Sequence, residues 1–345
     1  MGPRIDDRAT HVLRHIVDEY VATAEPVGSR TISKKMGQAL SPATIRNIMA
    51  DLEEMGFLAQ PHTSAGRIPT GLGFRYYIDH LLHLRSLAQG EVNQLNLAAQ
   101  EGGATADELV RQISRLLANM ACQASIVIVS RPDQHRLRSV NLLRAAVDKI
   151  LLVAVMEGGY VQHRLIDGEP DVTADELEKI NAYLNELAEG LTLPQLRVRI
   201  LGELQQEKAR YDRVMRRALT VGARALSDSG PGEVFVEGRA NILDQPEFAE
   251  DVERLKRILR AFEEKSVIFR LLDRAMASQA IQVSIGPENP VEDMGDVSVV
   301  ASGYQQGTSA VGSIGLIGPV RMDYSRVIPL VEYTANLLTT MFGQR

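Results

Sequence analysis

The sequence predicts an α+β protein of several domains: an N-terminal winged helix-turn-helix, then an α+β body interrupted by a helix-rich segment. Three observations predict this fold class. The 345 residues suffice for two or three domains. Helical patterns and one short hairpin occupy the first 85 residues. Runs of β-branched residues then form two groups on either side of further helical patterns, and one interrupted domain joins them most simply.

The head, residues 1–85, begins with helices whose ends carry typical capping and breaking residues. A residue before proline avoids helical backbone angles, so the first helix stops ahead of Pro26. Ser41 is a favoured N-cap that opens the third helix, and Gly56 ends it. The turn-forming run 61–66 separates two short strands. The predicted elements are helices over 12–21, 29–36, 41–55 and 74–84, and strands over 57–60 and 67–68.

The body follows a small, polar segment, residues 86–103, that we expect to be a partly helical linker. Capping-box patterns at Thr105 and Thr173 begin two helices. The first four strands are expected to form one meander, and Pro329 is expected to kink the last helix. The predicted helices cover 105–121, 173–187, 195–226, 252–262 and 324–342; the predicted strands cover 125–130, 139–143, 150–156, 161–166, 233–236, 281–285, 297–300 and 314–317.

The third helix of the head suits the major groove of DNA. Its apolar stripe faces the core, which leaves Thr44, Arg46 and Asn47 pointing outward beside two small alanines. Arginine pairs with guanine through two hydrogen bonds, asparagine pairs similarly with adenine, and threonine serves a base or a phosphate. An ordinary surface helix with a proline at its start is the alternative.

Charge is distributed unevenly along the chain. The net charge of −6, with 24% charged and 45% hydrophobic residues, indicates a globular protein whose surface as a whole does not wrap nucleic acid. Residues 1–85 carry ten basic and nine acidic side chains, whereas residues 86–345 carry 28 and 35. Segments 26–47 and 55–78 hold six basic residues and no acid. These six are Arg30, Lys34, Lys35, Arg46, Arg67 and Arg75. They predict a local DNA-binding surface, and a solvated basic face is the alternative.

We therefore expect base contacts from Thr44, Arg46 and Asn47, and phosphate contacts from the residues around them. The turn between the short strands forms the wing, where hydroxyls, an imidazole and an arginine can donate to phosphates. Gly66 lets the wing backbone bend. The expected phosphate contacts are Arg30, Lys34, Lys35, Ser41, His62, Thr63, Ser64 and Arg67.

Metal and catalytic alternatives have less support. His11 and His15, like His80 and His83, are spaced as metal ligands can be, but no cysteine or local carboxylate pattern completes a tetrahedral set. Cys122, the single cysteine, is expected to be buried and apolar rather than a nucleophile. The sequence contains no phosphate-binding loop or hydrolase motif, so we expect neither a cofactor nor an enzyme. Without a signal peptide or a membrane-length apolar run, we expect a cytoplasmic protein.

Two segments carry a more specific signature. LSPATIRNIMADLEEMGFLAQPHTSAGRIPTGLGFRYYID runs from Leu40 to Asp79, and RMDYSRVIPLVEY runs from Arg321 to Tyr333. They resemble the heat-inducible transcription repressor HrcA family, most specifically at SPATIRN and HTSAGRIPT, and the resemblance covers essentially the whole chain. Gly71 departs from the family pattern, where a more polar residue is expected, and this concerns only the loop after the wing.

The resemblance implies a homodimer that represses chaperone operons by binding an inverted-repeat operator, CIRCE, in double-stranded DNA. It implies that the chaperonin GroEL keeps the repressor active and that heat shock abolishes this activity. It also implies a winged-helix domain (1–85), a linker (86–103), a GAF-like domain in two segments (104–170 and 266–345) and an inserted dimerisation domain (171–265).

Two points stay open from the sequence. The apolar stripe of 195–226 is either core within one chain or a helix-mediated dimer contact. The chain could also be a small-molecule-gated transcription regulator that senses through its GAF-like domain, although no cluster of polar residues identifies a ligand site. A GAF-like enzyme would lack a catalytic constellation.

Overall fold

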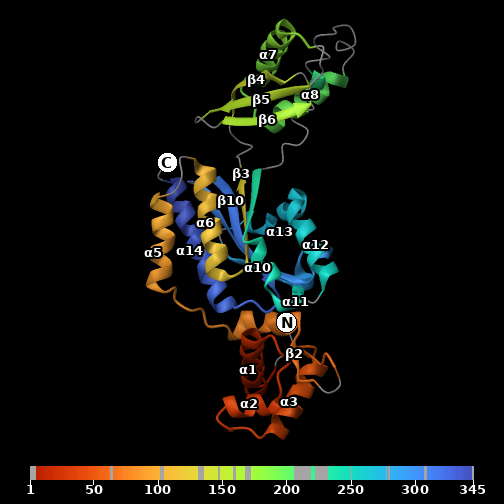
Figure 1. The fold of residues 1–345 in the computed structure, drawn as a ribbon, viewed down its shortest axis with the longest axis vertical. Helices are drawn as coiled ribbons and strands as arrows, with labels where there is room; N and C mark the ends of the chain where they lie inside the picture. The colour runs from red at the N-terminus through yellow and green to blue at the C-terminus, as the bar shows by residue number, and fades with distance from the viewer. Residues whose placement is uncertain are drawn as a thin grey trace. The chain divides into compact units, whose positions relative to one another are not determined.

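The computed structural model divides the chain into two compact units, Met1–Ser130 with Val234–Arg345, and Arg131–Glu233 (Figure 1). The structure describes residues 5–62, 65–101, 105–130, 136–146, 148–157, 161–167, 172–205, 219–221, 232–249, 251–276, 278, 280–306 and 309–343.

The head of the first unit has the predicted order of helices and strands. Three helices precede a two-stranded antiparallel hairpin, in which Leu58 pairs with Pro69 and Ala59 with Ile68. A short helix then continues into one turn of π-helix. The elements are α1 (Asp7–Thr23), α2 (Ser29–Lys35), α3 (Pro42–Glu54), β1 (Leu58–Ala59), β2 (Ile68–Pro69), α4 (Gly71–Tyr76) and η1 (Tyr77–Leu81). The helix-turn-helix and hairpin predictions are confirmed.

Local residues fix the ends of these elements. Ser41 accepts a hydrogen bond from the Thr44 amide at 3.1 Å, which caps α3 as predicted. Gly56 follows α3 with a φ of 81°, a left-handed conformation that favours glycine. Thr70 caps α4 in the same way by accepting from the Gly73 amide at 3.1 Å. Fully buried apolar side chains from α1, α2, α3 and α4 then meet in one core.

The body of the first unit is a five-stranded sheet with helices on both faces, in the order β7-β3-β10-β9-β8. Helices α6 and α14 cover one face and α13 covers the other (Figure 1). Because both faces are packed, side chains of β3 alternate between two buried clusters. The strands are β3 (Ala124–Ser130), β7 (Gly232–Glu237), β8 (Gln282–Ile285), β9 (Val297–Gln306) and β10 (Ser309–Pro319). The helices are α5 (Gln89–Glu101), α6 (Ala106–Ala121), α10 (Arg239–Leu243), α11 (Pro246–Ala249), α12 (Val252–Glu263), α13 (Lys265–Met276) and α14 (Tyr324–Gly343), with 3-10 turns η3 (Gly286–Glu288) and η4 (Glu292–Met294).

The second unit is a three-stranded antiparallel sheet, β4-β5-β6, with helices on one face. Its elements are β4 (Leu137–Ala146), β5 (Lys149–Met156), β6 (Val161–Asp167), α7 (Ala174–Ala188) and α8 (Leu193–Gln205). Alternate residues of β5 are buried against the helices, and the residues between them are partly exposed. The prediction of one four-stranded meander is therefore wrong, because β3 belongs to the five-stranded sheet.

The units also correct the expected domain boundaries. The interruption covers Arg131–Glu233 rather than 171–265, so β4–β6 belong with α7 and α8, while α12 and α13 belong to the body. Residues 86–103 contain more than a linker, because α5 buries Leu95 and packs against α6 and α14. Most of the predicted helix 195–226 beyond Gln205 lies outside the described residues.

Pro329 lies inside α14, which continues from Tyr324 to Gly343. A proline has no amide hydrogen, so the carbonyl four residues earlier, that of Ser325, loses its helical donor. The amide of Arg85 donates to this carbonyl instead, at 3.0 Å. The proline therefore opens a hydrogen-bonding site on the helix.

Candidate nucleic-acid interface

The residues predicted to read DNA share the exposed face of α3. Thr44, Arg46 and Asn47 are all exposed, while Ile45 and Met49 are buried beneath them. The predicted orientation of this helix is confirmed. An exposed arginine and asparagine on neighbouring positions are suited to donate to base edges in a major groove.

The start of α3 is fixed by a second hydrogen bond in its cap. The Ser41 and Thr44 hydroxyls lie 2.9 Å apart. Ser41 thus serves the cap, and both residues remain exposed beside the helix N-terminus. A helix N-terminus favours negative charge, which suits a phosphate contact at this point.

The wing is anchored to the helix-turn-helix through Arg67. Its backbone exchanges two hydrogen bonds with Val27, each 2.9 Å long. A Cβ on Gly66 would lie 2.4 Å from the Val27 carbonyl oxygen, so only glycine fits. Gly66 is therefore required for this close approach rather than for an unusual bend. His62 is exposed at the other end of the wing, whereas Thr63 and Ser64 lie outside the described residues.

Three of the six basic residues of the predicted DNA-binding surface are held by acids. The Nε of Arg67 contacts Glu53 at 2.8 Å, and this arginine side chain is 20% exposed. Lys35 pairs with Glu19, and Arg75 pairs with Glu288 of the body. Sequence reasoning missed these acids because each comes from another element.

The other three, Arg30, Lys34 and Arg46, are exposed and form no ion pair within the described part of the chain. Arg30 and Arg46 line a groove of about 590 Å³ between the start of α2, α3 and the wing. Arg67 borders the same groove from the wing. The geometry therefore combines the exposed face of α3 with unpaired cations and a lateral groove.

The remaining sequence candidates do not form a second site. No group of three or more metal-ligating side chains is assembled among the residues that the structure describes. Cys122 is exposed, contrary to the prediction, because it ends α6 in a left-handed conformation with a φ of 51°. None of the described helices has the length and apolar character needed to cross a bilayer.

This combination defines a class of protein: a transcription regulator with a winged helix-turn-helix carried on a larger α+β body. The family model described as "HrcA protein C terminal domain" matches residues 107–328. The chain belongs to the HrcA family.

Full-length relatives support the same assignment. Proteins named heat-inducible transcription repressor HrcA are 42% identical in Syntrophobacter fumaroxidans, covering 99% of this chain and 98% of theirs, and 41% identical in Geobacter sulfurreducens, covering 98% of each. A crystal structure described as a hypothetical protein at 2.2 Å resolution has a TM-score of 0.60 and 23% identity over 99% of both chains. That likeness concerns the fold alone.

Proposed function

We propose that this chain is a heat-inducible transcription repressor that binds an inverted-repeat DNA operator as a homodimer. The exposed face of α3, with Arg46 and Asn47 beside unpaired cations, is the observation that carries the proposal. The names of the relatives favour a repressor over a small-molecule-gated regulator. A repressor works where the chromosome lies, which agrees with the cytoplasmic location predicted from the sequence.

In this proposal α3 lies in the major groove of one half-site. Arg46 and Asn47 contact bases, and Thr44 contacts a base or a nearby phosphate. Arg30 and Lys34 are free to neutralise phosphates, because no acid of the described chain holds them. The remaining proposed phosphate contacts are Lys35, Ser41, His62, Thr63, Ser64 and Arg67. Of these, Lys35 and Arg67 would have to share their charge with Glu19 and Glu53.

A two-fold operator calls for a two-fold protein, and the second unit offers a surface for it. One face of its sheet packs on helices, but the opposite face exposes apolar side chains. Leu143 is 51% exposed, Leu165 is 54% exposed, and Leu151 lies between them in the same cross-strand row. We propose that this sheet face packs against its counterpart in a second copy of the chain, in agreement with the dimerisation role that the resemblance assigns to the insertion.

The HrcA resemblance supplies the regulatory part of the proposal. The operator is the CIRCE element of chaperone operons, and the chaperonin GroEL maintains the active repressor. Heat unfolds or aggregates the repressor, and chaperonin occupied by other clients no longer restores it. A folded protein is stable by only about 5–15 kcal/mol, so a modest rise in temperature can shift its population substantially.

The test is a DNA titration of the full chain against a CIRCE inverted repeat, a single half-site and a scrambled duplex at one salt concentration. We expect the order inverted repeat, half-site, scrambled duplex, from tightest to weakest. Equal affinity for the inverted repeat and the scrambled duplex would refute the operator-binding proposal.

The variant Leu165→Asp tests the dimer separately. A charge in the exposed apolar row should shift the protein to a monomer by light scattering, lower inverted-repeat affinity and leave half-site affinity in place. Ala182→Asp, on the exposed side of α7, is the matched control in the same unit. A Leu165→Asp protein that remains a dimer would remove this sheet face from the proposal.

A further inference from the structure

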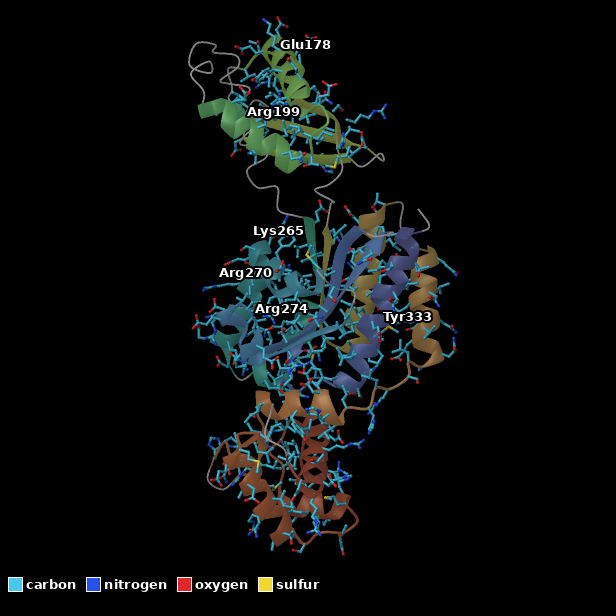
Figure 2. All side chains as sticks on the ribbon, turned by 180° about the vertical axis from the view of Figure 1, so that it is seen from behind. Glu178, Arg199, Lys265, Arg270, Arg274 and Tyr333 are labelled. Atoms are coloured by element: carbon cyan, nitrogen blue, oxygen red, sulfur yellow. The ribbon has the colours of Figure 1, made fainter. Side chains whose placement is uncertain are left out.

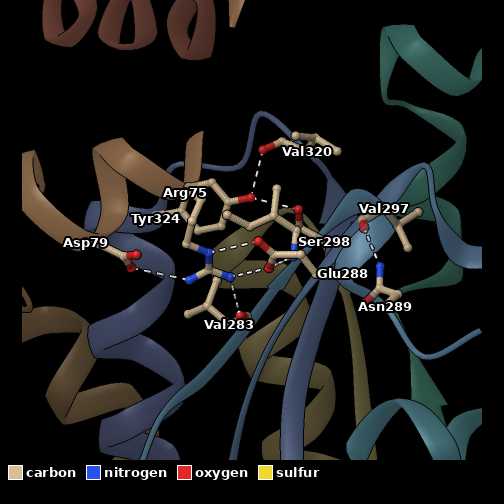
Figure 3. A network of polar contacts seen from close by, with 10 residues as sticks. Arg75, Asp79, Val283, Glu288, Asn289, Val297, Ser298, Val320 and Tyr324 are labelled. Carbon is tan, nitrogen blue, oxygen red and sulfur yellow. Dashed lines mark hydrogen bonds and ion pairs between the residues drawn. The ribbon is translucent and has the colours of Figure 1, made fainter. Parts of the chain in front are cut away.

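The head of the first unit is joined to the body by an arginine from α4. The Nε of Arg75 donates to Oε1 of Glu288 at 3.0 Å, and a second guanidinium nitrogen contacts Oε2 (Figure 3). The same nitrogen donates to the Val283 carbonyl at 2.7 Å. Asp79 lies 3.4 Å from the third nitrogen. A planar guanidinium bound at two carboxylate oxygens fixes direction as well as distance, which a single contact does not.

The body holds its side of this contact in place. Oε2 of Glu288 accepts the Ile285 amide at 3.0 Å, so the carboxylate is fixed at the turn after β8. Burial raises the pKa of Glu288, but the hydrogen bonds from Arg75 and Ile285 outweigh burial and bring the pKa below its ordinary value. Arg274 of α13 adds a favourable charge nearby. The ionised pair is therefore the stable form at neutral pH.

The C-terminal signature segment makes further contacts with the head. Arg321 pairs with Glu247 and also donates to the Val21 carbonyl at the end of α1, at 3.3 Å. The Ser325 carbonyl, which Pro329 leaves without a helical donor, accepts the Arg85 amide at 3.0 Å. Both contacts involve residues of RMDYSRVIPLVEY, a segment that the DNA-contact proposal does not use.

An apolar contact completes this junction. Phe74 of α4 and Tyr324 of α14 are fully or almost fully buried, and their ring centroids are 6.1 Å apart. The Tyr324 hydroxyl is held by Ser298 and by the Val320 carbonyl (Figure 3). The buried side chains of the head and of one face of the body consequently form one continuous cluster. We call this set of contacts the head–body junction.

We propose that Arg75 is a positioning residue for operator binding: its pair with Glu288 fixes the orientation of the DNA-binding head on the body. The inference rests on the proposed homodimer and inverted-repeat operator. Once one head of a dimer has bound its half-site, the second binds from within the same complex. Its effective concentration depends on how narrowly its position and direction are set. A head that swivels on its body spends less time aligned with the second half-site.

The experiment compares wild type, Arg75→Gln, Glu288→Gln and the charge swap Arg75→Glu/Glu288→Arg in the full chain. Each protein is titrated with a half-site, with the inverted repeat, and with an inverted repeat whose spacer is lengthened by about half a helical turn. Arg270→Gln is the matched control, because Arg270 is exposed on α13 and forms no ion pair among the described residues (Figure 2).

We expect both single variants to bind the inverted repeat about tenfold more weakly and the half-site within about twofold of wild type. The loss of affinity caused by the longer spacer should be smaller in these variants than in wild type. The charge swap should restore part of the wild-type affinity for the inverted repeat and part of its sensitivity to the spacer. A variant with the wild-type spacer penalty, tighter inverted-repeat binding, or an equal loss on the half-site overturns the positioning role. If wild type itself does not prefer the inverted repeat over the half-site, the proposed function fails first. Glu288→Gln keeps the inference testable if Arg75→Gln does not fold.

Discussion

The basic side chains of the head differ in whether an acidic side chain forms an ion pair with them. Arg46 is exposed on α3 without an acidic partner among the described residues, whereas Arg67 is held by Glu53 and Arg75 by Glu288. An unpaired cation gives up no ion pair when it meets a phosphate or a base. A paired cation must share its acidic partner with the DNA or break the ion pair. This distinction decides which substitutions should affect DNA recognition directly.

The variant Arg46→Ala should weaken operator binding by about 1–3 kcal/mol and relax the sequence preference, because it removes a side chain proposed to contact a base. Titrations with the operator and with single-base variants of the operator would measure both effects.

The variant Lys34→Ala is the contrasting case on the neighbouring helix. It should weaken binding to all sequences alike and reduce the slope of log affinity against log salt concentration by about one, as expected for a phosphate contact.

For Arg46→Ala, a sequence selectivity equal to that of wild type would exclude base reading by Arg46.

At the residue scale, sequence patterns identified the exposed side of α3 because helical periodicity alone decides which side chains face the core. They could not identify the partners of Arg67 and Arg75. Glu53 is 14 positions from Arg67, and Glu288 is 213 positions from Arg75. Only the folded chain brings these acids and bases together. A run of basic residues in a sequence therefore indicates a candidate surface and leaves open which of its charges are free.

At the scale of elements, α4 lies directly against the residue that precedes β1. A Cβ on Gly73 would lie 2.2 Å from the Phe57 carbonyl oxygen. The variant Gly73→Ala should therefore push α4 away from the hairpin and destabilise the first unit by about 1–3 kcal/mol. Thermal unfolding, followed together with operator binding, would measure this loss.

The matched control is Gly90→Ala in α5 of the same unit, where an added Cβ meets nothing within 4 Å. This change should be neutral or slightly stabilising, because alanine favours helix more than glycine does. Similar stabilities for the two variants would contradict the close approach at Gly73.

The edge of β4 is closed by two asparagines of α7. The Asn185 amide accepts the Val140 N–H at 2.8 Å and donates to its carbonyl at 2.7 Å. Asn181 does the same for Leu142, at 2.7 and 3.0 Å. Backbone groups that would otherwise pair with another strand are thereby occupied, which protects the sheet against edge-to-edge association.

The variant Asn185→Ala should destabilise the second unit by about 1–3 kcal/mol, because two partly buried backbone groups lose their partners. It should also promote aggregation through the opened edge, measurable by light scattering of the heated protein. Glu186→Ala, exposed on the same turn of α7, is the control and should leave both properties unchanged.

Helices and their caps were largely predictable, because caps are local in sequence. The distribution of strands between sheets was not. Ile126–Val129 in β3 and Ile150–Met156 in β5 are both continuous apolar runs, yet β3 is buried on both faces and β5 on one. Periodicity cannot separate these cases when the exposed face of a strand is itself apolar. Because the exposed face of β5 is apolar, the sequence pattern also could not reveal the sheet face that we propose as the dimer contact.

At the scale of the whole molecule, the head–body junction should respond to acid. Since the pKa of Glu288 lies below its ordinary value of 4.5 in the folded protein, its ionisation adds stability above that pH, and this stability is lost as the pH falls through the lowered value. The stability difference between wild type and Glu288→Gln should be constant near neutral pH and shrink below about pH 4.5.

Denaturant unfolding from neutral pH down to about pH 3 would follow this difference. Glu263→Gln, at an exposed position in α12, is the control. A difference that grows on acidification would contradict the contribution of the ionised pair.

The two units were not delimited correctly from the sequence, because a boundary depends on which strands share a sheet. The capping box at Thr173 gives a clear local start for α7, but it lies inside the second unit rather than at its edge. The boundaries of the units fall between β3 and β4, two consecutive strands, and near β7, so the local pattern marks no change of domain at β3.

The interruption begins after β3 and ends at β7, and these strands are neighbours in the same sheet. In its place, a short connection between the two strands would leave the order of the five-stranded sheet unchanged. From an evolutionary viewpoint, the second unit is a cassette: a gene could gain or lose it in one event without redesigning the core around it. The same modularity means that the sheet face proposed as the dimer contact and the residues proposed to contact DNA can diversify independently.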